Sequence, residues 1–242
     1  MIVEVCANSL ESALIAEQAG ADRLEVCAEL GIGGITPSYG VLLKIKEMLS
    51  IPAHVLIRPR SGDFSYSDIE FDVMLSDIDR CVDMGFEGIV SGVLHRDFTL
   101  DIERTAALVE RSAGLQFTFH RAFDWVADPL RTLAELEAIG VNNILSSGQA
   151  KNAVEGLELL EKLLQGAANS TIIPAAGIRS DSALKLKKLG FSAIHLSGVN
   201  QYPTLLSPPK VPMITKSLLA EDRIAVTELE IIEEVIKELN KD

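Results

Sequence analysis

The chain has 242 residues, of which 48% are hydrophobic and 24% charged, a balance that supports a buried core and excludes a disordered protein. Its 22 lysines and arginines face 35 aspartates and glutamates, so the formal charge of −13 argues against nucleic acid or membrane surfaces as partners. With no long apolar run, no basic signal-peptide region and three cysteines without paired spacing, we expect a cytoplasmic protein with reduced thiols and no structural zinc.

Eight short strand-like runs alternate with helical segments along the chain. They cover residues 2–6, 23–27, 53–58, 88–92, 116–120, 143–147, 171–175 and 193–197. Because their spacing of about 20 to 35 residues is that of one βα unit, we predict an α/β fold of the (β/α)8 TIM-barrel type. A doubly wound sheet is the main alternative, but no glycine-rich dinucleotide motif follows the first strand, so no nucleotide cofactor is expected.

Recognisable capping residues predict where several helices begin. Two helices have a cap residue followed by proline at the first helical position, and two have a capping box. These predicted starts are Thr36 with Pro37, Ser67 with Glu70, Asp128 with Pro129, and Asn152 with Glu155.

The tail after residue 198 differs from the rest of the chain. It is rich in proline between positions 203 and 212 and then acidic and helical from 227 to 239. We therefore divide the chain into a barrel, 1–200, and a C-terminal extension, 201–242, that packs on the barrel or on a second subunit. The apolar stripe expected to make this contact consists of Leu229, Ile232, Val235 and Leu239.

Alternation along each strand predicts which side chains face the interior of the barrel. Phe117 and Phe119 suit the outer face of the fifth strand, and Leu24 with Val26 that of the second. The predicted interior is then strongly polar, which signals a site, although Glu4 and Glu25 could also form structural ion pairs with arginines. The inward set is Glu4, Cys6, Arg23, Glu25, Cys27, His54, Arg58, Gln116, Thr118, His120, His195 and Ser197.

The segment HRAFDW after the fifth strand places His120, Arg121 and Asp124 on the C-terminal rim, where barrel enzymes carry their active sites. A histidine beside a carboxylate serves as general acid or base, so Glu4, Glu25, His120 and Asp124 are the candidate proton-transfer groups. The structural alternative is a rim salt bridge between Arg121 and Asp124.

Several loops offer groups for an anionic ligand. Arg58 and Arg60 follow the third strand, and Arg121 follows the fifth; arginine holds carboxylates and phosphates by parallel hydrogen bonds. Small residues after strands seven and eight suit phosphate binding through backbone N–H groups. The candidates there are Gly177, Ser197 and Gly198.

The sequence EVCA occurs twice, at residues 4–7 and 25–28. On neighbouring strands, Cys6 and Cys27 would lie about one strand spacing apart, roughly 5 Å. Two soft thiolates favour Cu(I), which needs no further ligand. The alternative is that both cysteines are small buried hydrophobic residues, as we expect for Cys81 in the amphipathic helix 68–84.

Six motifs together resemble the CutC family of copper homeostasis proteins. They are EVCANS at 4–9, GADRLEVC at 20–27, GGITPS at 33–38, HVLIRPRSGDFSYS at 54–67, FTFHRAFD at 117–124 and LSSG at 145–148. The resemblance implies a (β/α)8 barrel, often distorted, that is cytoplasmic, dimeric or higher, and linked to Cu(I) through the cysteines at positions 6 and 27. The turn AAGIRSD at 175–181 departs from the family's more glycine-rich sequence, which weakens the case for a phosphate site at this loop.

Two functions follow from these observations. The first is a copper homeostasis protein that binds Cu(I) through Cys6 and Cys27. The second is a barrel enzyme, of the isomerase, lyase or aldolase type, acting on a small anionic or phosphorylated substrate. Since no lysine stands at a predicted inward position, a Schiff-base mechanism is disfavoured.

Overall fold

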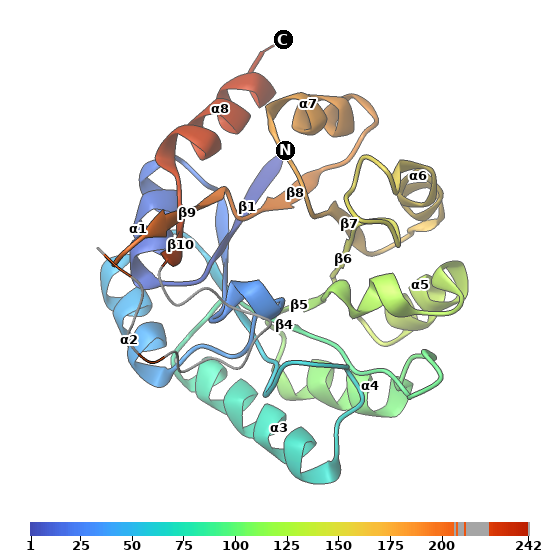
Figure 1. The fold of residues 1–242 in the computed structure, drawn as a ribbon. Coiled ribbons are helices and arrows are strands. Elements are labelled where there is room, and N and C mark those ends of the chain that lie inside the picture. Colours follow the sequence, from blue (N-terminus) through green and yellow to red (C-terminus); the bar gives the residue numbers. More distant parts are fainter. Residues whose placement is uncertain (206, 208–210, 212–222, 242) are drawn as a thin grey trace.

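The computed structural model describes residues 1–205, 207, 211 and 223–241. Eight parallel strands surround a common centre and helices cover their outside (Figure 1). The observed strands match all eight predicted runs, with ends that differ by at most two residues. They are β1 (Ile2–Ala7), β2 (Arg23–Val26), β3 (Ala53–Leu56), β4 (Gly88–Ser91), β5 (Gln116–Phe119), β6 (Asn143–Ser146), β7 (Thr171–Pro174) and β8 (Ala193–Leu196).

The barrel is closed except at one seam. The strand order is β7-β6-β5-β4-β3-β2-β1-β8, so the chain's first and eighth strands pair with each other. β7 and β8 lie side by side, yet in the described part of the chain no ladder of hydrogen bonds joins them. Pro174, which has no backbone N–H to donate, ends β7 at this seam. The predicted TIM-type barrel is confirmed, and its distortion lies at this seam.

Eight α-helices and two 3-10 turns accompany the barrel strands in the described part of the chain. The α-helices are α1 (Leu10–Gln18), α2 (Tyr39–Met48), α3 (Asp68–Asp83), α4 (Ile102–Arg111), α5 (Pro129–Ala138), α6 (Leu157–Gly166), α7 (Ser180–Lys188) and α8 (Leu229–Leu239). The 3-10 turns are η1 (Leu30–Ile32) and η2 (Arg121–Trp125).

Two predicted helix starts are confirmed and two are wrong. The capping box of Ser67 with Glu70 and the cap of Asp128 with Pro129 are both present.

The helix predicted at Thr36 begins later, because Ser38 caps α2 by accepting the Val41 N–H, while Thr36 accepts the backbone N–H of Arg58. Asn152 and Glu155 do hydrogen-bond to each other, but in a turn ahead of α6, whose cap is Gly156. Gly156 lies so close to Gly148 that a Cβ on either would overlap the other's backbone, so this close approach requires glycine at both positions.

The predicted outer faces of the strands form the main core between sheet and helices. Phe117, Phe119, Leu24 and Val26 are fully buried there, together with Cys81 from α3. Their burial confirms the alternation and leaves the other face of each strand toward the barrel interior.

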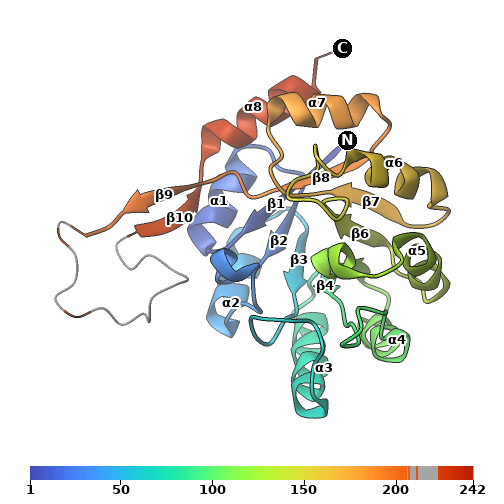
Figure 2. The same cartoon turned by 45° about the vertical axis from the view of Figure 1, so that its right-hand side comes forward.

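The tail adds a hairpin that the sequence did not reveal. β9 (Val199–Pro203) and β10 (Arg223–Thr227) pair antiparallel and project from the barrel in Figure 2. α8 follows and packs on α7 and α1, burying Ile232, Val235 and Leu239 of the predicted stripe. Much of the proline-rich stretch between 203 and 212 falls outside the described residues. The division at residue 200 stays a prediction.

Candidate functional site

The barrel interior carries the polar side chains that alternation placed there. Of the inward set, Ser197 is half-buried, and Gln116 is an exception because it lies exposed at the start of β5, where the strand opens to solvent. The buried members are Glu4, Cys6, Arg23, Glu25, Cys27, His54, Arg58, Thr118, His120 and His195.

Glu4 forms the centre of a buried ion-pair network across three strands. The ladders set Glu4 of β1 opposite Arg23 of β2 and His195 of β8. Arg23 Nε donates to Glu4 Oε2 at 2.6 Å, and His195 Nδ1 lies 2.7 Å from Glu4 Oε1. Burial would raise the pKa of Glu4, but His195 and Arg23 outweigh it and lower that pKa to about 2, so Glu4 is a carboxylate. Burial lowers the pKa of His195, but the nearby Glu25 and the contact with Glu4 outweigh it and raise that pKa.

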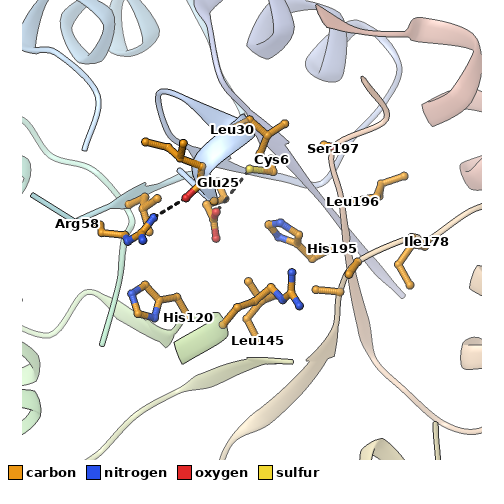
Figure 3. A pocket seen from close by; sticks show the side chains of 18 of the residues that line it. Cys6, Glu25, Leu30, Arg58, His120, Leu145, Ile178, His195, Leu196 and Ser197 are labelled. Carbon is orange, nitrogen blue, oxygen red and sulfur yellow. Dashed lines mark hydrogen bonds between the residues drawn. The ribbon is translucent and has the colours of Figure 1, made fainter. Parts of the chain in front are cut away.

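A cavity of about 700 Å³ lies beside this network and is bounded by strand ends and the loops that follow them (Figure 3). Seven of the candidate site residues line it: Cys6, Glu25, Arg58, His120, Arg121, Gly177 and Ser197. Apolar and aromatic side chains, among them Leu145, Phe64 and Trp125, complete the wall. A pocket of this size and mixed lining suits a small organic molecule.

The two cysteines meet at one side of the cavity. Their sulfurs are 3.6 Å apart, and Cys6 Sγ also lies 3.6 Å from Glu25 Oε1. Hydrogen bonding with Cys27, burial and the nearby Glu25 carboxyl raise the pKa of Cys6 well above its usual range. Burial likewise raises the pKa of Glu25. The Cys6 thiol therefore holds its proton, and a metal ion bound there would have to displace it.

Cys6 belongs to a second arrangement of ligand atoms. Its sulfur, a carboxylate oxygen of Glu25 and a ring nitrogen of His195 all lie within 4.8 Å of one another, and all three residues are buried. A thiol, a carboxyl group and an imidazole make a harder donor set than two thiols, so the two arrangements favour different metal ions.

Three arginines approach the cavity from loops. Arg58 is anchored by carbonyl oxygens: its Nη1 donates to Ile32 and Gly34, and its Nη2 to Gly62. Arg121 is half-exposed and donates to Asp124 and Ser147. Arg179, which lies in the turn AAGIRSD but was not among the candidate residues, also lines the cavity.

The remaining candidate residues lie outside the cavity lining. Arg60 pairs with Glu70 and Asp63, near the start of α3. Asp124 forms the predicted rim salt bridge with Arg121 and also accepts hydrogen bonds from the loop after β6, including the Ser147 N–H and hydroxyl. Gly198 packs against Ile232 of α8.

His120 is held in one tautomer by its own loop. Its Nδ1 accepts the backbone N–H of Ala122, so the ring proton is on Nε2. Nε2 is buried and has no hydrogen-bond partner among the described residues. Burial and the positive charge of Arg58 lower the pKa of His120 to about 3, which keeps the ring neutral.

His195 is the site residue to which the sequence assigned no role. Alternation predicts that it faces inward, but its contact with Glu4 depends on the pairing of the first and last strands of the barrel, 191 residues apart. No short sequence motif predicts the pairing of these two strands.

Comparison with known proteins then identifies the family. The profile of the CutC family matches residues 1–200. A CutC family protein of Serratia proteamaculans is 42% identical over 204 residues, which are 84% of this chain and 81% of that protein. The chain belongs to the CutC family.

Further relatives agree with this assignment. A CutC family protein of Edwardsiella ictaluri is 43% identical over 85% of this chain and 82% of its own length. The crystal structure of a candidate copper homeostasis protein CutC from Streptococcus agalactiae superposes with a TM-score of 0.77 and 30% identity, covering 81% of this chain and 97% of that one. A thiamine phosphate pyrophosphorylase from Pyrococcus furiosus, at 15% identity and a TM-score of 0.59, shares the fold alone.

Proposed function

We propose that this CutC-family chain is a copper homeostasis protein that binds Cu(I) through Cys6 and Cys27. The observation that carries the proposal is the 3.6 Å separation of the two sulfurs, with Cys6 in the wall of an open cavity. The Streptococcus agalactiae relative, described as a candidate copper homeostasis protein, supports the copper role but does not bear on the ligands.

The surroundings of the sulfurs fit a soft monovalent ion. Cys6 and Cys27 cluster with Leu56 and Val90, so apolar side chains surround the pair except where the Glu25 carboxyl group approaches Cys6. Thiolate ligands select Cu(I) among the available metal ions. No positively charged group hydrogen-bonds to either sulfur among the described residues, so the charge of the ion itself must stabilise the thiolates.

Anaerobic competition against a chromophoric Cu(I) chelator tests the proposal. We expect tight binding of one ion per chain, and loss of at least about tenfold in affinity, the scale on which ligand-shell changes act, in Cys6→Ser, Cys27→Ser and the double variant. Cys81→Ala is the matched control, because Cys81 is buried in the core around α3. Unchanged affinity in the double variant would contradict the proposal.

A second function is favoured by the charge of the cavity. Arg58, Arg121 and Arg179 line it with a single carboxyl group, Glu25, in a chain whose formal charge is −13. Concentrated positive charge of this kind attracts anions. We propose that the cavity binds a small organic anion, with Gly177 and Ser197 as further donors, as an enzyme substrate.

Ligand-observed NMR with two probes, pyruvate as a carboxylate and dihydroxyacetone phosphate as a phosphate ester, tests anion binding. We expect saturation transfer to at least one probe, with its loss in Arg121→Met. Arg131→Met, an exposed arginine on α5, is the matched control. If saturation transfer to the probes is unchanged in Arg121→Met, the probes do not bind in the cavity and the proposal is wrong.

We also propose a cytoplasmic, homo-oligomeric protein. All three cysteines are free, as expected for a reducing compartment. In the described part of the chain, no helix has the length and apolar character needed to cross a membrane. The resemblance to the CutC family supports a homo-oligomer. Light scattering on the purified chain measures its mass and so tests this state.

A further inference from the structure

We infer that the cavity removes a proton from the carbon next to a carbonyl group of its ligand, with His195 as the base and His120 as the donor to the carbonyl oxygen. This inference rests on the second proposed function, the binding of a small organic anion. It names a substrate class, carbonyl-bearing organic acids or phosphate esters, and a reaction class, enolisation.

Hydrogen bonds on one wall of the cavity identify His195 as the base. Glu4 accepts from Arg23 through one oxygen, so it is an ionised acceptor, and its other oxygen faces His195 Nδ1 at 2.7 Å. His195 Nδ1 therefore carries the ring proton and donates it to Glu4. Glu4 is fully buried and lies outside the cavity lining, whereas the His195 ring lines the cavity (Figure 3). In the neutral ring, which is present above the pKa that Glu25 and Glu4 raise, the other nitrogen, Nε2, is thus an acceptor on the cavity side.

The opposing wall offers donors. His120 Nε2–H and Arg58 Nε–H are both buried, and neither has a hydrogen-bond partner among the described residues. Both residues line the cavity. A buried donor without a partner costs about 1–3 kcal/mol, so a ligand oxygen that accepts from them recovers that cost.

Together the two walls match one functional group. A carbonyl compound offers an oxygen to His120 and Arg58 and an acidic C–H bond to His195. In the step, the C–H bond breaks, the proton passes to His195 Nε2, and the electron pair moves through the new C=C bond onto the oxygen. The resulting oxyanion is stabilised by the N–H donors, and return of a proton to the same carbon completes exchange of its hydrogen. In an α-hydroxy carbonyl compound, the hydroxyl proton can instead move to the oxyanion while the abstracted proton is added to the former carbonyl carbon, which completes an isomerisation. No oxidant or further reactant is needed.

Copper binding does not account for these groups. Two thiols suffice to hold Cu(I), whereas the His195 contact with Glu4 and the tautomer of His120 both lie outside the cysteine pair. The buried Nε2–H of His120, which has no partner among the described residues, also costs stability.

Hydrogen–deuterium exchange at carbon tests the inference. Pyruvate and dihydroxyacetone phosphate are incubated with the full chain in D2O containing EDTA and a Cu(I) chelator, and their C–H signals are followed by ¹H NMR. We expect exchange of at least one probe at about 100 times the buffer rate, the lower end of what a positioned base contributes. His195→Gln should return exchange to the buffer rate while saturation transfer to the probe persists.

Matched variants separate the roles. His120→Gln keeps an N–H donor and should retain part of the exchange, whereas His120→Phe should lose it. His95→Gln, at an exposed histidine outside the cavity, should change nothing. Thermal melting confirms that each variant folds, and if His195→Gln does not fold, the His120 pair still decides the outcome.

The failures are distinguishable. Binding of both probes without exchange overturns enolisation and leaves anion binding standing, whereas absence of binding overturns both. Exchange that survives in His195→Gln, or that disappears when the chelators are present, overturns the assignment of the base.

Discussion

The two walls of the cavity are built in different ways. On the wall from β1, β2 and β8, the functional groups contact one another: Cys6 meets Glu25, and His195 meets Glu4. On the opposite wall, Arg58 and His120 are held by backbone carbonyl and N–H groups of nearby loops. The first wall is a coupled network of side chains, whereas the second consists of single donors fixed by their own loops.

This difference suggests a division of labour. A coupled network can share protons or hold a metal ion, and removing one member leaves another buried charge uncompensated. Donors fixed by the backbone can orient a ligand without responding to changes across the cavity. Variants on the two walls should therefore differ in size of effect and in pH dependence.

The largest effect is expected for Glu4→Ala. It leaves the buried Arg23 and His195 without their shared carboxylate, which should lower the free energy of unfolding by about 3–5 kcal/mol. Urea denaturation followed by circular dichroism measures this change. Glu11→Ala, at an exposed position in α1, is the control, and a loss below about 1 kcal/mol in Glu4→Ala would show that the network is not coupled.

A smaller loss is expected for Arg58→Met on the opposite wall. The variant keeps an apolar stem but leaves the Ile32, Gly34 and Gly62 carbonyls without this donor, at a cost of about 2–3 kcal/mol. The same denaturation experiment measures it. In a double variant with Glu4→Ala, the two losses should add within about 0.5 kcal/mol; a larger deviation would mean that the walls act as one unit.

The contributions of His120 and His195 to the free energy of unfolding should change in opposite directions with pH. The pKa of His120 is about 3, below its unfolded value, so the unfolded chain binds a proton that the folded chain does not as pH falls from about 6.5 toward 3. Stability should drop by up to about 1.4 kcal/mol per pH unit across that window, and His120→Gln should remove this drop.

The pKa of His195 is raised instead. Its stabilising contribution is present below the unfolded pKa and is lost as pH rises through the folded one. His195→Gln should therefore cost most stability in acid. Urea midpoints measured from pH 4 to 8 for both variants make the comparison, and parallel curves would refute it.

The smallest effect is expected for Arg60→Gln. Arg60 forms partly exposed ion pairs with Glu70 and Asp63, and such pairs contribute at most about 1 kcal/mol. Since Arg60 lies outside the cavity lining, anion binding in the NMR experiment should be unchanged. A loss of anion binding in Arg60→Gln would mean that Arg60 does contribute to the binding site, as the sequence predicted.

The site could be predicted because successive side chains of a strand alternate between the interior of the barrel and the helices outside it. This alternation placed Glu4, Cys6, Glu25 and His195 inside the barrel because the outer positions had to pack on helices. The same argument failed at Gln116, where the strand begins outside the enclosed part of the barrel.

The remaining features depend on loops and register. Arg58 is fixed by carbonyls of the turn around η1, where Glu29, Gly33 and Gly34 all have positive φ. Such a turn path cannot be derived from residue types alone. The contact between His195 and Glu4 needs the closing ladder between β1 and β8, a pairing that follows from the whole topology.

The seam between β7 and β8 has a consequence for access. Within the described residues β8 is hydrogen-bonded to β1 on one edge and to no strand on the other, so fewer bonds must break for it to move than for a strand in the middle of the sheet. Amide protons of β8 should then be released to deuterium sooner than those of β2, which has partners on both edges. Because β8 carries His195, one of the two barrel strands that are bonded on a single edge in the described part of the chain also holds the proposed base, so opening of the seam would move that base relative to the rest of the cavity.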